Sequence, residues 1–182
     1  MVNINLPQLT SLQDQTIQLL FIKAGTALNQ RQIARALNVT PPAILKALPR
    51  LKQENFITQN QDPESKRWSV RLNRNNHRVI QLKRAHNLKQ IYISGLADFL
   101  EKEFAGACVI VFGSYSKGED TFTSDVDIAI IGRKQKQPLL SNFEQTLERK
   151  ININYYDSFN RIHKHLKENL CNGIVLAGGI EL

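Results

Sequence analysis

The stretch ACVIVFGSYSKGEDTFTSDVDIAII, residues 107–131, decides the fold of the second half of the chain. Its first part, residues 107–113, is a continuous apolar run that predicts a buried strand, because strands covered on both faces lose the alternation of polar and apolar residues. Residues 124–131 predict a second buried strand. A polar loop that begins at Gly113 joins the two, so the chain turns sharply between neighbouring core elements.

The residues that follow extend this pattern into an α/β domain. ININYY, residues 151–156, predicts a third strand, and the helical patterns lie at 139–150 and 158–170. Residues 173–180, GIVLAGGI, fit a final strand or turn that covers the sheet. Strands that alternate with helices predict a small α/β domain with a mixed sheet.

Two aspartates lie in the second of these predicted strands. Asp125 and Asp127 are two positions apart, so both carboxylates leave the same face, with Cα atoms roughly 6–7 Å apart. Val126 and Ile128 then face the core. Two neighbouring carboxylates are costly unless a positive charge lies between them, and Mg²⁺ (or Mn²⁺) takes such oxygen ligands together with phosphate oxygens. The pair therefore predicts a metal site.

The loop before the aspartates is suited to phosphate. Gly113 allows a phosphate to approach the backbone, and a short helix from Ser114 would direct N–H groups and a hydroxyl toward it. Lys117 is placed either to balance the phosphate charge or simply to be solvated at the surface. Ser124 is placed to orient Asp125 through its hydroxyl.

The full pattern, Gly-Ser-x₉-Ser-Asp-x-Asp followed by Ile-Ala-Ile-Ile, resembles the signature of the DNA polymerase β-type nucleotidyltransferase superfamily, and most of all its minimal nucleotidyltransferase (MNT) branch. The resemblance covers residues 88–182. It implies that Gly113 and Ser114 hold the nucleotide's β- and γ-phosphates, and that Asp125 and Asp127 are catalytic and bind Mg²⁺.

Active members of that superfamily carry a third carboxylate on the following strand. Here the positions on that strand that face the aspartates are Asn152 and Asn154, and Asn152 stands at the expected place. An amide oxygen can bind a metal weakly, but an amide accepts no proton and supplies no charge. Asp157, the nearest acid in sequence, lies past the end of the strand. This departure favours nucleotide binding over fast nucleotidyl transfer.

The positive charge of the chain is concentrated in its first half. Residues 1–85 contain 13 Lys and Arg against four acids, whereas residues 86–182 contain 11 against 12. A basic excess confined to one half indicates a polyanionic partner for that half, although a merely soluble basic surface would give the same count.

Three helices are predicted in this basic half. Residues 11–24 have helical apolar spacing, residues 29–38 begin at Asn29 as a plausible N-cap, and Thr40 followed by two prolines starts the helix that runs to residue 54. In this third helix Ile44, Leu48 and Leu51 face inward, and Lys46, Ala47 and Arg50 lie on the other side. Residues 56–60 and 67–73, joined by a polar turn, predict a β-hairpin.

Residues 29–57, NQRQIARALNVTPPAILKALPRLKQENFI, resemble the helix-turn-helix of bacterial and archaeal winged-helix regulators, and the likeness extends over residues 10–74. It implies binding of double-stranded DNA by a homodimer, with the third helix in the major groove. The residues expected to contact bases or lie beside them are Thr40, Lys46, Arg50 and Lys52. The residues expected to meet phosphates are Lys66, Arg67, Arg71 and Arg74.

The whole chain is therefore predicted to be an α+β protein of two domains. Residues 1–74 form a winged helix-turn-helix of three helices and a hairpin wing, residues 75–87 a connecting helix, and residues 88–182 a small nucleotidyltransferase-like α/β domain with a mixed sheet. The helical pattern itself continues to residue 104, with possible breaks near Asn87 or Gly95. Such a helix could pack on its own domains or form a dimer seam.

Composition excludes several other classes. No apolar run approaches the roughly 20 residues that span a bilayer, and the first residues lack the features of a signal peptide. Cys108 and Cys171 lie in apolar sequence without metal-ligand spacing, which favours two buried thiols in a cytoplasmic protein over a disulfide or a zinc site. His163 and His165 are expected at the surface.

Two functions remain open on the sequence. The first is a transcriptional regulator whose second domain binds Mg-NTP as a sensor or a weak enzyme. The alternative is an active nucleotidyltransferase that modifies a nucleic acid or a protein, including a partner toxin modified by an antitoxin-type enzyme.

Overall fold

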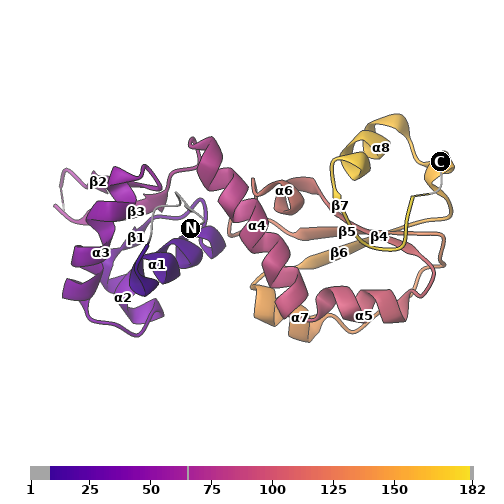
Figure 1. The fold of residues 1–182 in the computed structure, drawn as a ribbon, viewed down its shortest axis with the longest axis horizontal. Helices are drawn as coiled ribbons and strands as arrows, with labels where there is room; N and C mark the ends of the chain where they lie inside the picture. Colours follow the sequence, from indigo (N-terminus) through magenta and orange to yellow (C-terminus); the bar gives the residue numbers. More distant parts are fainter. Residues whose placement is uncertain (1–8, 65, 181–182) are drawn as a thin grey trace, which may run out of the picture. The chain divides into compact units, whose positions relative to one another are not determined.

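The computed structural model describes residues 9–64 and 66–180, so residues 1–8, Ser65 and residues 181–182 of the predicted domains lie outside the description. Its contacts divide the chain into two compact units, Met1–Val79 and Ile80–Leu182. Each unit combines helices with its own sheet, which confirms the predicted α+β class (Figure 1).

Between residues 9 and 76, leaving out residue 65, the first unit contains three helices and a small antiparallel sheet. Its elements are α1 (Ser11–Ile22), β1 (Leu28–Asn29), α2 (Gln30–Ala36), α3 (Pro41–Gln53), β2 (Ile57–Gln61) and β3 (Trp68–Leu72). The sheet order is β1-β3-β2, so the predicted hairpin is present and gains a short third strand. The sequence pattern did not reveal β1, because two residues are too few to show alternation.

Capping residues determine where two of these helices start. Thr10 and Gln13 form a reciprocal capping box at α1, and Asn29 and Gln32 form another at α2. Thr40 is the N-cap residue of α3, as predicted, but its side chain makes no capping hydrogen bond. Prolines at the first helical positions remove N–H groups that a cap would otherwise have to satisfy.

The core of the first unit lies between the helices and the sheet, and α3 contributes more of it than predicted. Ile44, Leu48 and Leu51 are buried as expected, but Ala47 is buried as well, so its predicted outward position was wrong. The spacing i, i+3, i+4, i+7 from Ile44 makes one wide apolar stripe that includes position 47.

Helix α4 (His77–Ile93) continues from the first unit into the second, and α5 (Leu96–Glu103) follows after a break. Val79 belongs to the core of the first unit and Ile91 to a core of the second. The break falls at Gly95, one of the two predicted places, where a φ of +77° ends the right-handed geometry at little cost for glycine.

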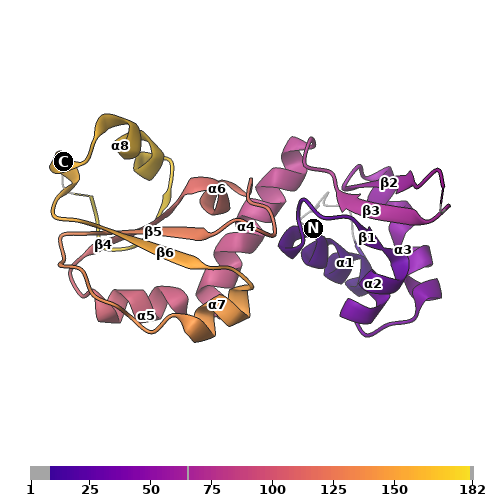
Figure 2. The same cartoon turned by 180° about the vertical axis from the view of Figure 1, so that it is seen from behind.

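The second unit is a four-stranded mixed sheet covered on both faces. Its strands are β4 (Cys108–Phe112), β5 (Val126–Ile131), β6 (Ile151–Tyr156) and β7 (Ile174–Ala177), in the order β6-β5-β4-β7. Strands β5 and β6 are parallel, whereas β4 is antiparallel to both of its neighbours. Figures 1 and 2 show α5 and α7 (Ser141–Leu147) over one face of the sheet and α8 (Lys164–Cys171) over the other, and Ile91 near the end of α4 joins the core on the α5 side.

Both helices after β5 are shorter than predicted. Glu148 has a φ of +52°, so α7 ends at Leu147 rather than near residue 150. The predicted helix at 158–170 is divided into a 3-10 turn, η1 (Phe159–Arg161), and α8, because Ile162 and His163 adopt extended backbone geometry.

Two surface expectations have different outcomes. His163 and His165 are exposed, as predicted. Cys108 is buried, but Cys171 is exposed at the end of α8, so the expectation of two buried thiols was wrong; both are free. Within the described ranges, no helix combines the length and apolar character that crossing a bilayer requires.

Candidate functional site

Gly113 and Asp127 lie against each other at one end of the sheet. Phe112, the last residue of β4, pairs with Asp127 in β5, so the residue after it turns directly beside this carboxylate. Gly113 has a φ of +74°, and a Cβ atom on it would lie 2.9 Å from Oδ2 of Asp127. Glycine is therefore favoured by the backbone conformation, and a larger residue would also displace the end of the Asp127 side chain.

Asp125 and Asn152 meet at the same end. Strand β5 begins at Val126, so Asp125 lies one residue before the strand rather than within it. Asn152 pairs with Asp127 in the parallel register, and its Nδ2 donates a hydrogen bond of 2.9 Å to Oδ2 of Asp125. The amide thus lies beside both aspartates, while Asn154 pairs with Ala129 one step farther along the strand.

The predicted phosphate loop contains the short helix α6 (Gly113–Lys117). The Ser116 hydroxyl donates to the carbonyl of Gly113 at 2.9 Å, and the N–H of Glu119 donates to the carbonyl of Ser114 at the same distance. Ser114 and Lys117 are both half-buried. These two hydrogen bonds fix the backbone of residues 113–119.

Ser124 has a different local partner from the one predicted. Its hydroxyl accepts a hydrogen bond from the N–H of Thr121 at 3.0 Å and contacts the Thr121 hydroxyl at 3.2 Å. The side chain therefore closes the turn over residues 121–124, and Asp125 takes its hydrogen bond from Asn152 instead.

The side chains gathered here offer two carboxylates and one amide as ligands for a divalent cation. Among residues 9–64 and 66–180, no group of three or more His, Cys, Asp or Glu side chains could hold a metal ion. Mg²⁺ commonly binds through one or two carboxylates and completes its shell with phosphate oxygens and water. Asp125 and Asp127 can provide those two carboxylates, and Gly113 turns beside Asp127 without a side chain of its own.

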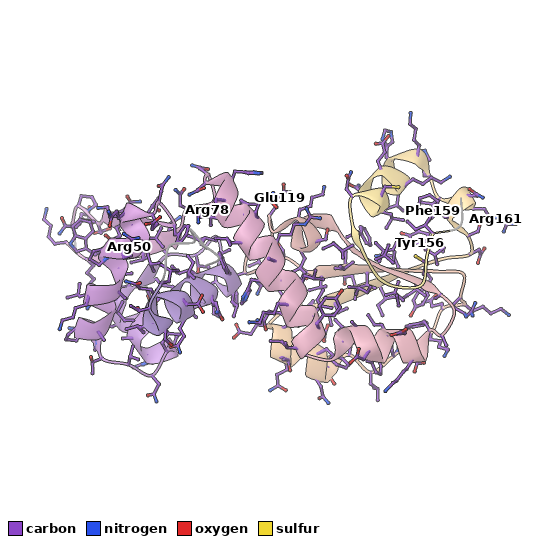
Figure 3. All side chains as sticks on the ribbon, viewed as in Figure 1. Arg50, Arg78, Glu119, Tyr156, Phe159 and Arg161 are labelled. Atoms are coloured by element: carbon purple, nitrogen blue, oxygen red, sulfur yellow. The ribbon has the colours of Figure 1, made fainter. Side chains whose placement is uncertain are left out.

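The same face of the sheet becomes apolar away from the aspartates. Tyr156 lies at the far end of β6 and packs against the cluster that includes Phe159 and Leu170 (Figure 3). Burial raises the pKa of the Tyr156 hydroxyl, and the negative charge of Asp127 raises this pKa further. The polar site is thus confined to the end of the sheet where β5 and β6 begin.

In the first unit, the predicted base-contacting residues spread over the outer side of α3. Thr40, Lys46 and Lys52 are exposed, and Lys46 lies opposite the buried stripe. Arg50, labelled in Figure 3, forms an ion pair of 2.8 Å with Glu54. Helical periodicity places Arg50 and Lys52 on opposite flanks of Lys46.

The wing presents the predicted phosphate-contacting residues at its surface: Lys66, Arg67, Arg71 and Arg74 are exposed. It also presents an aromatic residue that the sequence pattern did not single out. Trp68 shares a strand face with buried Val70, yet 52% of it is exposed, because it lies at the end of the strand beyond the core. Trp68, Leu45 and Pro49 line an apolar groove of about 230 Å³.

Comparisons with known families agree with this two-part organisation. Residues 95–180 match the family model described as Polymerase beta, Nucleotidyltransferase, and residues 19–68 match the model of the MarR family. The predicted resemblances are thereby confirmed: a MarR-like winged helix is followed by a nucleotidyltransferase-like region. A search of curated proteins gave no match.

The solved structures with some similarity include MepR and the repressor AdcR. The MepR–DNA complex of S. aureus is 21% identical, with a TM-score of 0.39, and the match covers 52% of this chain and 77% of that one. The adhesin competence repressor AdcR of Streptococcus pyogenes is 19% identical, with a TM-score of 0.41, and the match covers 54% of this chain and 69% of that one.

The turn at Gly113, which lies beside the Asp127 carboxylate, gives a prediction for Gly113→Ala. A positive φ alone costs an alanine about 1–2 kcal/mol of folding free energy. The matched control is Gly132→Ala, because Gly132 has a φ of +86° and open space around its Cβ position. We expect Gly113→Ala to be less stable than Gly132→Ala in urea unfolding and to lose Mn²⁺ binding that Gly132→Ala keeps. Equal stability and equal Mn²⁺ affinity of the two variants would show that the Asp127 site does not require a glycine at position 113.

Proposed function

We propose that this chain is a DNA-binding transcriptional regulator whose second unit binds an NTP together with Mg²⁺ and transfers a nucleotidyl group slowly at most. One observation carries the second half of the proposal. The position where active nucleotidyltransferases have a third carboxylate is occupied by Asn152, whose amide donates a hydrogen bond to Asp125.

An amide at position 152 has different consequences for nucleotide binding and for nucleotidyl transfer. Asp125 and Asp127 still provide two carboxylates for a cation, and Gly113 and Ser114 would then offer backbone N–H groups to a phosphate. An amide cannot accept the proton of an attacking hydroxyl. When bound, Mg²⁺ would neutralise phosphate charge. The residues present therefore favour a stable nucleotide complex over a rapid reaction.

The first unit supports the DNA-binding half of the proposal. In this arrangement α3 would enter the major groove with Lys46 at the centre of its exposed face, and the basic wing would follow the phosphates. We expect a homodimer with two copies of α3, because operators read by winged-helix proteins usually have two-fold symmetry.

The second candidate function is active nucleotidyl transfer to a nucleic acid or to a partner protein, such as a toxin. Both aspartates of the motif are present, which favours it. Incubation with labelled NTP, Mg²⁺ and DNA, RNA or the protein itself separates the candidates. Label transfer that is lost in Asp125→Asn and Asp127→Asn would establish the enzyme, whereas nucleotide binding without transfer supports the regulator.

Asn152→Asp tests the role of the amide. This change adds a third carboxylate next to Asp125 and Asp127, so we expect about tenfold tighter Mn²⁺ binding, equivalent to about 1.4 kcal/mol, and faster transfer of label from NTP. The matched control is Asn154→Asp, since Asn154 lies on the same strand but opposite Ala129. If the wild-type protein already transfers label as fast as Asn152→Asp, the amide does not limit the reaction.

Arg67→Ala tests the wing. Arg67 is exposed in the wing. A phosphate contact carries no sequence information, so we expect weaker binding to all duplexes alike and a salt slope reduced by about 1. Arg161→Ala serves as the control, because this exposed arginine lies in the second unit. A changed order of preferred sequences in Arg67→Ala would mean that Arg67 reads bases instead.

A further inference from the structure

A buried ionic cluster lies beneath the loop that leads to Asp125. Its members are Asp120 (1% exposed), Lys83 (0%), Asn87 (4%) and Arg149 (6%). They come from three parts of the second unit: Lys83 and Asn87 from α4, Asp120 from the loop between α6 and β5, and Arg149 from the turn before β6. Burying charges is expensive unless each one is paired and hydrogen-bonded.

Asp120 is the centre of this cluster. Its Oδ1 accepts hydrogen bonds from Nζ of Lys83 and from Nδ2 of Asn87, the latter at 2.7 Å. Its Oδ2 lies 3.5 Å from a terminal nitrogen of Arg149. Asn87 also donates from Nδ2 to the backbone carbonyl of Tyr115 in α6, at 2.9 Å. One carboxylate therefore joins the loop to two other elements.

The backbone of the loop is also pressed against α4. Gly118, which follows α6, has a φ of +77°, and a Cβ atom on it would lie 2.5 Å from the carbonyl oxygen of Ile80 and 2.7 Å from the nitrogen of Arg84. Only glycine permits this approach. The loop is thus held on α4 by a close backbone contact at Gly118 and by ionic hydrogen bonds two residues later.

The segments that come before and after Asp125 are both linked to this cluster. After Asp120, the turn at Thr121–Ser124 is closed by its own hydrogen bonds, and Asp125 follows directly. Arg149 precedes Lys150, whose carbonyl accepts a hydrogen bond of 2.8 Å from Val126. Residues 121–124 therefore follow Asp120 directly, and Val126 is hydrogen-bonded to the residue next to Arg149.

We propose that Asp120 is a positioning residue: through Lys83, Asn87 and Arg149 it fixes the loop of residues 118–125 on α4 and so sets the place of Asp125 beside Asp127 and Asn152. Its consequence for ligand binding rests on the function proposed above. The fixing of the loop is a property of the protein alone and can be measured without ligand.

Asn87→Leu is the main variant, because it removes the donor to Asp120 and to Tyr115 while leaving every charge in place. Lys89→Ala, at an exposed position of the same helix, is its control. Hydrogen exchange of residues 121–125 reports on the loop, and Mn²⁺ titration of the folded protein, well below its unfolding temperature, reports on the site. We expect about tenfold faster exchange and about tenfold weaker Mn²⁺ binding in Asn87→Leu only, because hydrogen bonds to charged groups are the strong ones.

Asp120→Asn gives a second test. Alone it removes the negative charge that faces Lys83 and Arg149, so the combination Lys83→Met with Asp120→Asn, which restores the net charge of the cluster, serves where the single variant does not fold. We expect faster exchange of the loop in this combination too. Lower thermal stability with unchanged exchange and unchanged Mn²⁺ affinity would overturn the proposal and leave the cluster a purely structural one. A wild-type protein that binds no Mn²⁺ would refute the proposed function, while the exchange rates would still decide the role of Asp120.

Discussion

The contact between Gly113 and the carboxylate of Asp127 is the constraint on which the arrangement of the second unit depends. Strand β4 ends at Phe112, opposite Asp127 in β5, and the chain then turns at Gly113 with a positive φ that glycine adopts at little cost. The same register brings Asn152 next to Asp127 and within a hydrogen bond of Asp125. Two carboxylates, one amide and a backbone turn thus share one end of a sheet whose interior is mostly apolar.

The loop of residues 118–125 is held on α4 by the ionic hydrogen bonds of Asp120. Asp120 lies between two cations in the interior, and such pairs gain from mutual attraction only when geometry and hydrogen bonds are good. Removing one partner leaves an uncompensated charge, so the cluster allows few alternative positions of the loop. Helix α4 carries Lys83 and Asn87 of this cluster and also Val79 of the other unit's core, so this helix connects the first unit to the second along the chain.

The features that the sequence predicted were those with local patterns. The apolar runs identified β4, β5 and β6, and the Gly-Ser and Asp-x-Asp spacing identified a nucleotidyltransferase-like region, since both depend on residues close together in the chain. The place of Asn152 was predicted from the resemblance to active nucleotidyltransferases, and the parallel register pairs this residue with Asp127. The Asp120 cluster was not predictable, because its ionic partners lie 37 and 29 residues away and a charged residue normally indicates surface. The burial of Ala47, the exposure of Cys171 and that of Trp68 depend on which neighbours cover each position, and local patterns do not report this.

The number of divalent ions in the nucleotide complex tests the central claim most directly. With two carboxylates and an amide, the site should hold one ion shared with the nucleotide, whereas a third carboxylate would complete a pair of ions. Mn²⁺ binding measured by electron paramagnetic resonance, in the presence of a non-hydrolysable NTP, counts them. We predict one Mn²⁺ per chain, bound more tightly when the nucleotide is present and lost in Asp127→Asn. Two ions per chain, or none, would contradict the account.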